Sequence, residues 1–210
     1  GDGDGDGDGD GDGDGDGDGD APAHLVINEI DYDDPGGDDM EFVEIYNPTT
    51  EALPLEGVHL AFVDGSDGDV YLDIDLSLTW EHVPPGGYYV VGSWALLATV
   101  PSGVMTQHHG GPLATNSVFE NGSPAGVVLY DTLGSSVIDA LSYEGECVVS
   151  DPGLGNFSLL EGQDADLADI GVDPTGSLVR VPNGQDTDDQ SVDWAYTLSH
   201  SPGEANQLSP

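Results

Sequence analysis

The first twenty residues alternate strictly between glycine and aspartate, from Gly1 to Asp20. This repeat has no apolar side chain to bury and no base to neutralise its carboxylates, so it cannot build a hydrophobic core by itself. In an extended strand, successive side chains point to opposite faces, so the carboxylates would share one face and bare glycine the other. The repeat therefore predicts one of two states, a flexible acidic linker or an ordered array neutralised from outside.

Divalent cations are the counter-ions that could order such an array. The carboxylates would recur about every 7 Å along an extended chain, where each pair repels by about 0.6 kcal/mol in water. Ca²⁺ takes roughly six to eight oxygen ligands, so about five ions would neutralise one repeat and bridge neighbouring chains. An EF-hand is excluded, because Gly13 stands where its loop needs a glutamate. We predict shared Ca²⁺ ligands at Asp2, Asp4, Asp6, Asp8, Asp10, Asp12, Asp14, Asp16, Asp18 and Asp20.

The charge balance is extreme throughout the chain. Arg180 is the only lysine or arginine, against 42 acidic residues, and the formal net charge is −41. Nucleic acids and anionic membranes would be repelled, so neither is expected as a partner. Divalent cations and cationic surfaces fit this charge, and a salt-adapted acidic surface is an alternative explanation. No apolar run approaches about 18 residues, which predicts no membrane insertion.

Two further features bear on processing and cross-linking. Cys147 is the only cysteine, so we expect a small buried side chain, with an intermolecular disulfide as the alternative. The sequence begins with Gly1 rather than methionine and shows no signal peptide. We therefore expect a processed form or a fragment, in which the native repeat could be longer.

Residues 21–210 read as one β-rich domain that follows the repeat at residues 1–20. Val70, Leu72 and Ile74 alternate with Tyr71 and Asp73, as in a strand that has one face buried and the other exposed to solvent. The predicted strands are 24–32, 41–47, 58–64, 70–76, 87–91, 127–130, 137–143, 177–181 and 191–196. A helical turn is expected at 93–99, and 144–174 reads as a poorly patterned excursion. Many short strands with regular turns indicate an all-β sandwich.

A series of short phrases, in this order, resembles the bacterial, extracellular branch of the lamin tail domain family. The phrases are LVINEI at 25–30, EFVEIYNP at 41–48, VPPGGYYVV at 83–91, GSPAGVVL at 122–129, SLVR at 177–180, DTD at 186–188 and SPGEAN at 201–206. The resemblance implies an immunoglobulin-like β-sandwich and an extracellular location, without implying catalysis. Bacterial members usually act as accessory modules of secreted proteins, so a cell-surface or matrix contact is expected.

Acidic residues also gather outside the repeat. One group lies in the first inter-strand loop, at Asp31, Asp33, Asp34, Asp38, Asp39 and Glu41, and a second lies at Asp186, Asp188 and Asp189. Each is interpreted either as an oxygen-ligand Ca²⁺ site or as a solvated turn. Glu29 and Glu44 interrupt apolar strands, and we predict that they pair with Arg180 as an internal anchor of the sandwich.

Three functions remain open at this level. The first is a non-enzymatic subunit of an extracellular filament, a homopolymer assembled through Ca²⁺-bridged repeats with β-sandwiches displayed outside. The second is a secreted accessory or adhesion module with an acidic flexible linker. The third, a metal-dependent hydrolase, is disfavoured because no nucleophile elbow is present and the adjacent pair His108–His109 lacks the spacing of a helical zinc site. We predict no catalytic residues.

Overall fold

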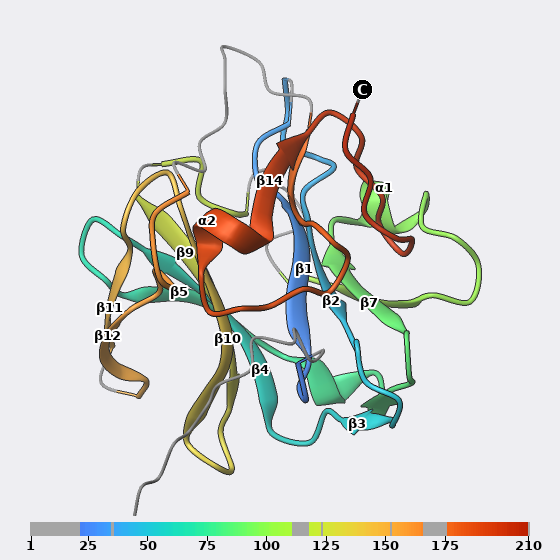
Figure 1. Cartoon of the computed structure of the whole chain (residues 1–210), viewed down its shortest axis with the longest axis horizontal. Helices are drawn as coiled ribbons and strands as arrows, with labels where there is room; N and C mark the ends of the chain where they lie inside the picture. Colours follow the sequence, from blue (N-terminus) through green and yellow to red (C-terminus); the bar gives the residue numbers. More distant parts are fainter. Residues whose placement is uncertain are drawn as a thin grey trace, which may run out of the picture.

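Two packed β-sheets form the body of the molecule in the computed structural model (Figure 1). The structure describes residues 22–34, 36–110, 118–122, 124–151, 153–165 and 176–209. The larger sheet has the strand order β14-β13-β1-β2-β7-β8, and the smaller has the order β10-β9-β4-β5. All neighbours are antiparallel except β7 and β8, which are parallel. The predicted all-β, immunoglobulin-like sandwich is confirmed.

The elements are short, as the closely spaced turns predict. The strands of the larger sheet are β1 (Val26–Asp31), β2 (Phe42–Tyr46), β7 (Tyr88–Gly92), β8 (Met105–His108), β13 (Ser177–Arg180) and β14 (Trp194–Thr197). Those of the smaller sheet are β4 (Val58–Asp64), β5 (Val70–Asp75), β9 (Ala125–Asp131) and β10 (Ser136–Tyr143). Two small ribbons pair β3 (Leu53–Pro54) with β6 (His82–Val83), and β11 (Val148–Asp151) with β12 (Gly155–Ser158). The helical pieces are η1 (Leu76–Leu78), α1 (Trp94–Leu97) and α2 (Gln190–Asp193).

The main core lies between the inner faces of the two sheets. Ile27 and Ile45 enter it from the larger sheet, and Leu60, Phe62 and Leu129 enter it from the smaller. The ring of Phe62 stacks on that of Phe119, with 4.3 Å between centroids. Every second side chain along these strands thus points inward and meets the inward side chains of the other sheet, as aligned sheet packing requires.

Both sheets are also covered on part of their outer faces. The hairpin β11–β12 places Val149 against Ala61, Val63 and Val128 of the smaller sheet, and Cys147 is fully buried in this outer cluster. On the larger sheet, Leu96 of α1 packs against outer-face side chains of β2 and β7. Double coverage explains why the central strands read as continuous apolar runs rather than as alternating ones.

Most predicted strands are present, with four differences. The excursion at 144–174 contains the unpredicted hairpin β11–β12, and β8 and the short ribbon β3–β6 were also missed. The predicted strand 191–196 is wrong in its first half, because Asp189 caps the short helix α2 before β14 begins at Trp194. The helical turn predicted at 93–99 is confirmed as α1, capped by Ser93. Within the described residues, no helix is long and apolar enough to cross a bilayer.

Candidate functional site: buried carboxylates around Arg180

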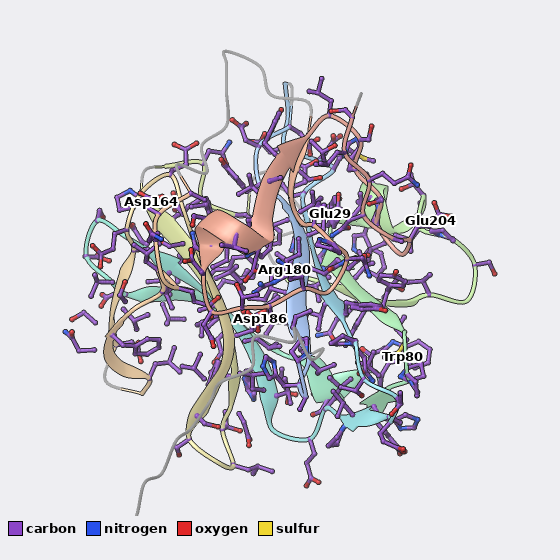
Figure 2. All side chains as sticks on the ribbon, in the orientation of Figure 1. Glu29, Trp80, Asp164, Arg180, Asp186 and Glu204 are labelled. Atoms are coloured by element: carbon purple, nitrogen blue, oxygen red, sulfur yellow. The ribbon has the colours of Figure 1, made fainter. Side chains whose placement is uncertain are left out.

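Arg180, the last residue of β13, lies fully buried near the centre of the molecule (Figure 2). Its Nη2 is 2.7 Å from Asp139 Oδ1, and its Nη1 is 3.2 Å from both Asp186 Oδ1 and Asp193 Oδ2. A fourth carboxylate, on Glu161, lies 3.7 Å from Nη2. The indole ring of Trp194 packs against the guanidinium, with 4.9 Å between Arg180 Cζ and the ring centroid. One cation thus faces four acids.

The local structure explains how these side chains converge. Asp139 points to the same face of β10 as the core residues Leu141 and Tyr143, so its carboxylate enters the space between the sheets. There it accepts hydrogen bonds from the backbone N–H of Ile27 at 2.6 Å and of Ala140 at 2.7 Å. The Arg180–Asp139 pair therefore links β13 of the larger sheet to β10 of the smaller sheet, which makes it an anchor between the two layers.

The predicted partners of Arg180, Glu29 and Glu44, are wrong. Glu29 accepts hydrogen bonds from the hydroxyl of Ser177 and from the backbone N–H and hydroxyl of Ser201. Glu44 accepts from the side-chain amide of Asn28 at 2.7 Å and from the N–H of Gly203 at 2.6 Å. These neutral donors replace the expected arginine, because β1 and β2 place the two glutamates beside the C-terminal segment.

That segment, residues 201–206, connects phrases that lie far apart in the sequence. The side-chain amide of Asn206 donates to the carbonyls of Asn28 and Arg180, each at 2.9 Å. Asn28 in turn accepts from the N–H of Gly184. Gly184 has a φ of +71°, and a Cβ there would lie 2.6 Å from the ring of Tyr46, so the close approach requires glycine. The phrases NEI, EIYN, SLVR and SPGEAN thus form one connected polar network, buried on the strands and partly exposed at residues 201–206.

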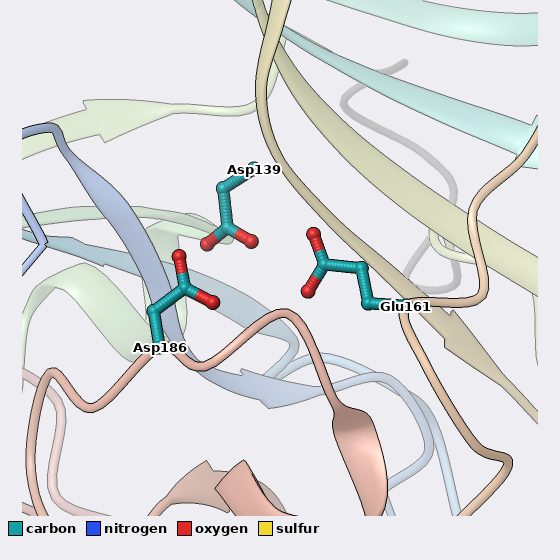
Figure 3. A group of neighbouring side chains, drawn as sticks. All are labelled: Asp139, Glu161 and Asp186. Atoms are coloured by element: carbon teal, nitrogen blue, oxygen red, sulfur yellow. The ribbon is translucent and has the colours of Figure 1, made fainter. Parts of the chain in front are cut away.

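Asp139, Glu161 and Asp186 can bring one oxygen each within 4.8 Å of one another (Figure 3). Among the described residues, they are the one such group of three acids, histidines or cysteines. Three oxygens fall short of the roughly six to eight that Ca²⁺ prefers, and the guanidinium already neutralises the space between them. The arrangement fits an ion-pair anchor rather than a metal centre.

Protonation relieves the excess negative charge at this site. Burial and the neighbouring Asp139 carboxylate together raise the pKa of Glu161 to about 9, against the opposing effect of Arg180. Burial likewise raises the pKa of Asp139 to about 6 against the opposing effect of Arg180. Glu161 Oε2 is buried and has no hydrogen-bond partner among the described residues. We therefore expect Glu161 to carry a proton at neutral pH.

Replacing Glu161 with glutamine is expected to leave the free energy of unfolding at pH 7 within about 1 kcal/mol of the parent, because glutamine matches the neutral acid. The matched change Asp193→Asn should cost about 1–3 kcal/mol. Asp193 accepts from Arg180, Gln185 and Thr187 with both oxygens, and asparagine retains one acceptor. Urea unfolding measures both. An equal loss in the two variants would contradict a protonated Glu161.

The acidic residues of the first loop do not converge as a metal site. Asn121 Nδ2 donates to Asp33 Oδ1 at 2.8 Å and to Asp38 Oδ2 at 3.2 Å. Asp34 Oδ2 accepts from the N–H of Met40. Asp31 instead pairs with His200 at 3.1 Å, and Glu41 accepts from the N–H groups of Val118 and Phe119. Of the two interpretations offered for this loop, these contacts favour a hydrogen-bonded turn over a Ca²⁺ site.

The second acidic group separates in a similar way. Asp186 joins Arg180, whereas Asp189 caps α2 by accepting from the N–H of Ser191. Asp188 has a φ of +55° and lies in the intervening turn. The histidine pair has a packing role, since His108 stacks on Trp94 and His109 lies against His108. Burial lowers the pKa of His109 to about 4.

The predicted Ca²⁺ ligands, Asp2 to Asp20, lie outside the described residues and stay a prediction, as does the domain boundary at residue 21. Cys147 is buried with its Sγ 3.9 Å from the carbonyl of Val63. This placement favours the apolar role over an intermolecular disulfide.

The two-layer sheet and its internally paired polar groups define an immunoglobulin-like β-sandwich module. The family model for the lamin tail domain matches residues 19–145, more than half of the chain. The chain belongs to the lamin tail domain family. Strands β13 and β14 and residues 201–206 follow the matched region in sequence but extend the same structure. Strand β13 pairs with β1, β14 pairs with β13, and residues 201–206 hydrogen-bond to Asn28 and Glu44 of β1 and β2. No curated protein and no solved structure matches the chain significantly.

Proposed function

We propose that this chain is a non-enzymatic structural subunit of an extracellular filament. In this arrangement the Gly-Asp repeats of neighbouring copies are bridged by Ca²⁺, and the β-sandwiches are displayed on the outside. Membership of an immunoglobulin-like, non-catalytic family is compatible with a structural module. The location and the assembly are the parts of this proposal that experiment must test.

The observation that carries the proposal is the composition of residues 1–20, in which ten carboxylates alternate with glycine and no base is present. An array of such segments requires cations, and carboxylate oxygens are ligands that Ca²⁺ prefers. The glycine face lets another backbone approach closely, as in stacked-strand assemblies. Charge and shape thus favour association once the acid is neutralised.

The fold supports an external source for that neutralising charge. The single arginine of the chain is 0% exposed and already faces four carboxylates. No lysine exists elsewhere in the sequence. Because no side chain with a fixed positive charge is free to reach the repeat of a neighbouring copy, the neutralising charge has to come from outside the chain, and this proposal assigns it to dissolved cations.

Filaments of the native material are expected to disassemble when Ca²⁺ is chelated, since the repeats then repel one another. Electron microscopy before and after prolonged EDTA treatment measures this, and readdition of Ca²⁺ should restore the filaments. A matched variant in which all ten repeat aspartates become asparagine should not respond to EDTA, because it has no carboxylates to bridge. Native filaments that survive chelation unchanged would contradict the ionic mechanism.

The main alternative is an accessory or adhesion module in which the repeat serves as a flexible acidic linker. A groove on the outer face of the smaller sheet, described below, is the observation that favours it. Hydrogen exchange distinguishes the two proposals. Fast exchange throughout Gly1–Asp20 in the native assembly supports the linker, whereas protected repeat amides support the bridged core.

A metal-dependent hydrolase is the least supported alternative. The carboxylates that come closest together are engaged by Arg180, and His59 and His200 face single aspartates, Asp73 and Asp31. These contacts fit packing and ion-pair roles better than a nucleophile with its base.

A further inference from the structure

The smaller sheet has an open groove on its outer face, beyond the part that the hairpin β11–β12 covers. The groove has a volume of about 490 Å³ and lies between β5, the β9–β10 hairpin and the turn that joins β11 to β12. Its volume falls in the range of roughly 300–1,000 Å³ that is typical of ligand pockets. None of the acidic residues around Arg180 lines it.

One part of the groove wall is apolar and aromatic. Tyr130 and Phe157 contribute rings, and Val70, Val137 and Leu154 contribute aliphatic side chains. Four of these five residues pack at the edge of the outer cluster while remaining only partly buried, and Val137 is 45% exposed. Such a surface suits a ligand with an apolar portion, which it would remove from water.

The rest of the wall is acidic. Asp73 accepts hydrogen bonds from the hydroxyl of Tyr130 at 2.8 Å and lies 2.9 Å from His59 Nδ1. Asp131 and Asp151 each use Oδ1 to accept backbone N–H groups of the turns that follow them. Tyr130, Asp73, Asp131 and Asp151 line the groove together, and burial, Asp73 and Asp151 all raise the pKa of the Tyr130 hydroxyl.

No lysine or arginine of the chain is available to this groove. The sequence has no lysine, and its only arginine is fully buried in the core. His59 lies beside Asp73, so a second copy of the chain has no fixed positive charge to offer Asp131 and Asp151. Anionic ligands would be repelled by the three aspartates, and a bare metal ion would gain nothing from the aromatic and aliphatic wall.

We propose that this groove binds a lysine side chain of a different, basic partner protein. The methylene stem packs along Val70, Val137 and Leu154, in the way that lysine stems cover apolar surface. The ammonium group reaches the faces of Tyr130 and Phe157 and the carboxylates of Asp131 and Asp151. This binding is independent of the Gly-Asp repeat and gives the displayed sandwich a specific contact with a cationic protein.

The test measures fluorescence anisotropy of a labelled lysine peptide, acetylated and amidated and spaced by glycine and serine. It uses the full chain in millimolar Ca²⁺ at physiological ionic strength, which limits non-specific attraction to the repeat. Phe157→Leu should weaken binding by about twofold to fivefold, since it removes the ring without changing charge. Asp131→Asn with Asp151→Asn should weaken it by about threefold to tenfold, and asparagine keeps the acceptor that each turn uses.

The control variant Glu51→Gln with Glu81→Gln removes the same charge from exposed positions outside the groove and should bind like the parent. Unchanged thermal unfolding of each variant shows that the hairpin is intact. Parent-like binding by Phe157→Leu, or equal weakening by the two charge-changing pairs, would overturn the proposal. So would chemical shifts of groove residues that respond to a neutral oligosaccharide and not to the lysine peptide.

Discussion

Replacing Arg180 with methionine is expected to lower the free energy of unfolding by about 3–5 kcal/mol at pH 8, the cost of leaving buried acids without their cation. Asp139 and Asp193 are both about 1% exposed and lose an ion pair in this variant. The two sheets also lose a connection, because Arg180 and Asp139 belong to different layers. Guanidinium chloride unfolding measures the change.

Two controls separate the charge effect from simple loss of packing. Adding Asp139→Asn to Arg180→Met should recover part of the loss, since it removes one uncompensated carboxylate. The penalty should also shrink at pH 5, where the orphaned acids bind protons more readily. A loss below about 1 kcal/mol at pH 8, or a loss that does not depend on pH, would show that the anchor is not electrostatic.

The second large effect is a fall in stability as the pH rises from about 5.5 to 9. Burial raises the pKa of Asp31 to about 7, of Glu41 to about 8 and of Glu161 to about 9. It also raises the pKa of Glu29 and Glu44. In the unfolded chain, these acids titrate near 4. The folded state therefore binds more protons in this window, and its stability is lost as the pH rises through the folded pKa values.

The expected decrease is at least about 2 kcal/mol, since one pKa unit on one group corresponds to about 1.4 kcal/mol. The pKa of His200 is raised by its hydrogen bond to Asp31, which acts in the same direction. The lowered pKa of His109 opposes it below about pH 6.5. Denaturant titrations at constant ionic strength provide the curve, and Glu41→Gln should flatten its upper part. Stability that is constant or rises over this window would contradict protonated internal acids.

The sequence predicted those parts of the fold that depend on local pattern. The bounds of β4 were predicted without error at 58–64, and Asp64 to Gly68 form the turn that joins it to β5, with a φ of +82° at Gly68. The short β11 and β12 were missed because exposed residues alternate there with few apolar ones. The strand β8 was missed because it pairs in parallel with β7, so no hairpin turn in the sequence indicates it.

The candidate site was less predictable, because its residues meet only through tertiary structure. The predicted anchor joined Arg180 to Glu29 and Glu44, whereas the partners of Arg180 come from β10, from α2 and from two loops. The wrong choice of Glu29 and Glu44 assumed that a buried carboxylate needs a charged partner. Backbone N–H groups and the hydroxyls of Ser177 and Ser201 satisfy these acids instead, and no charge pattern in the sequence identifies such donors.

The most direct test of the assembly mechanism is analytical ultracentrifugation of the purified full-length chain, titrated with Ca²⁺ to millimolar concentration. Ca²⁺-bridged assembly predicts polymers that sediment rapidly, about five bound Ca²⁺ ions per ten-aspartate repeat, and a return to single chains on chelation. A chain that remains monomeric throughout the titration would contradict it.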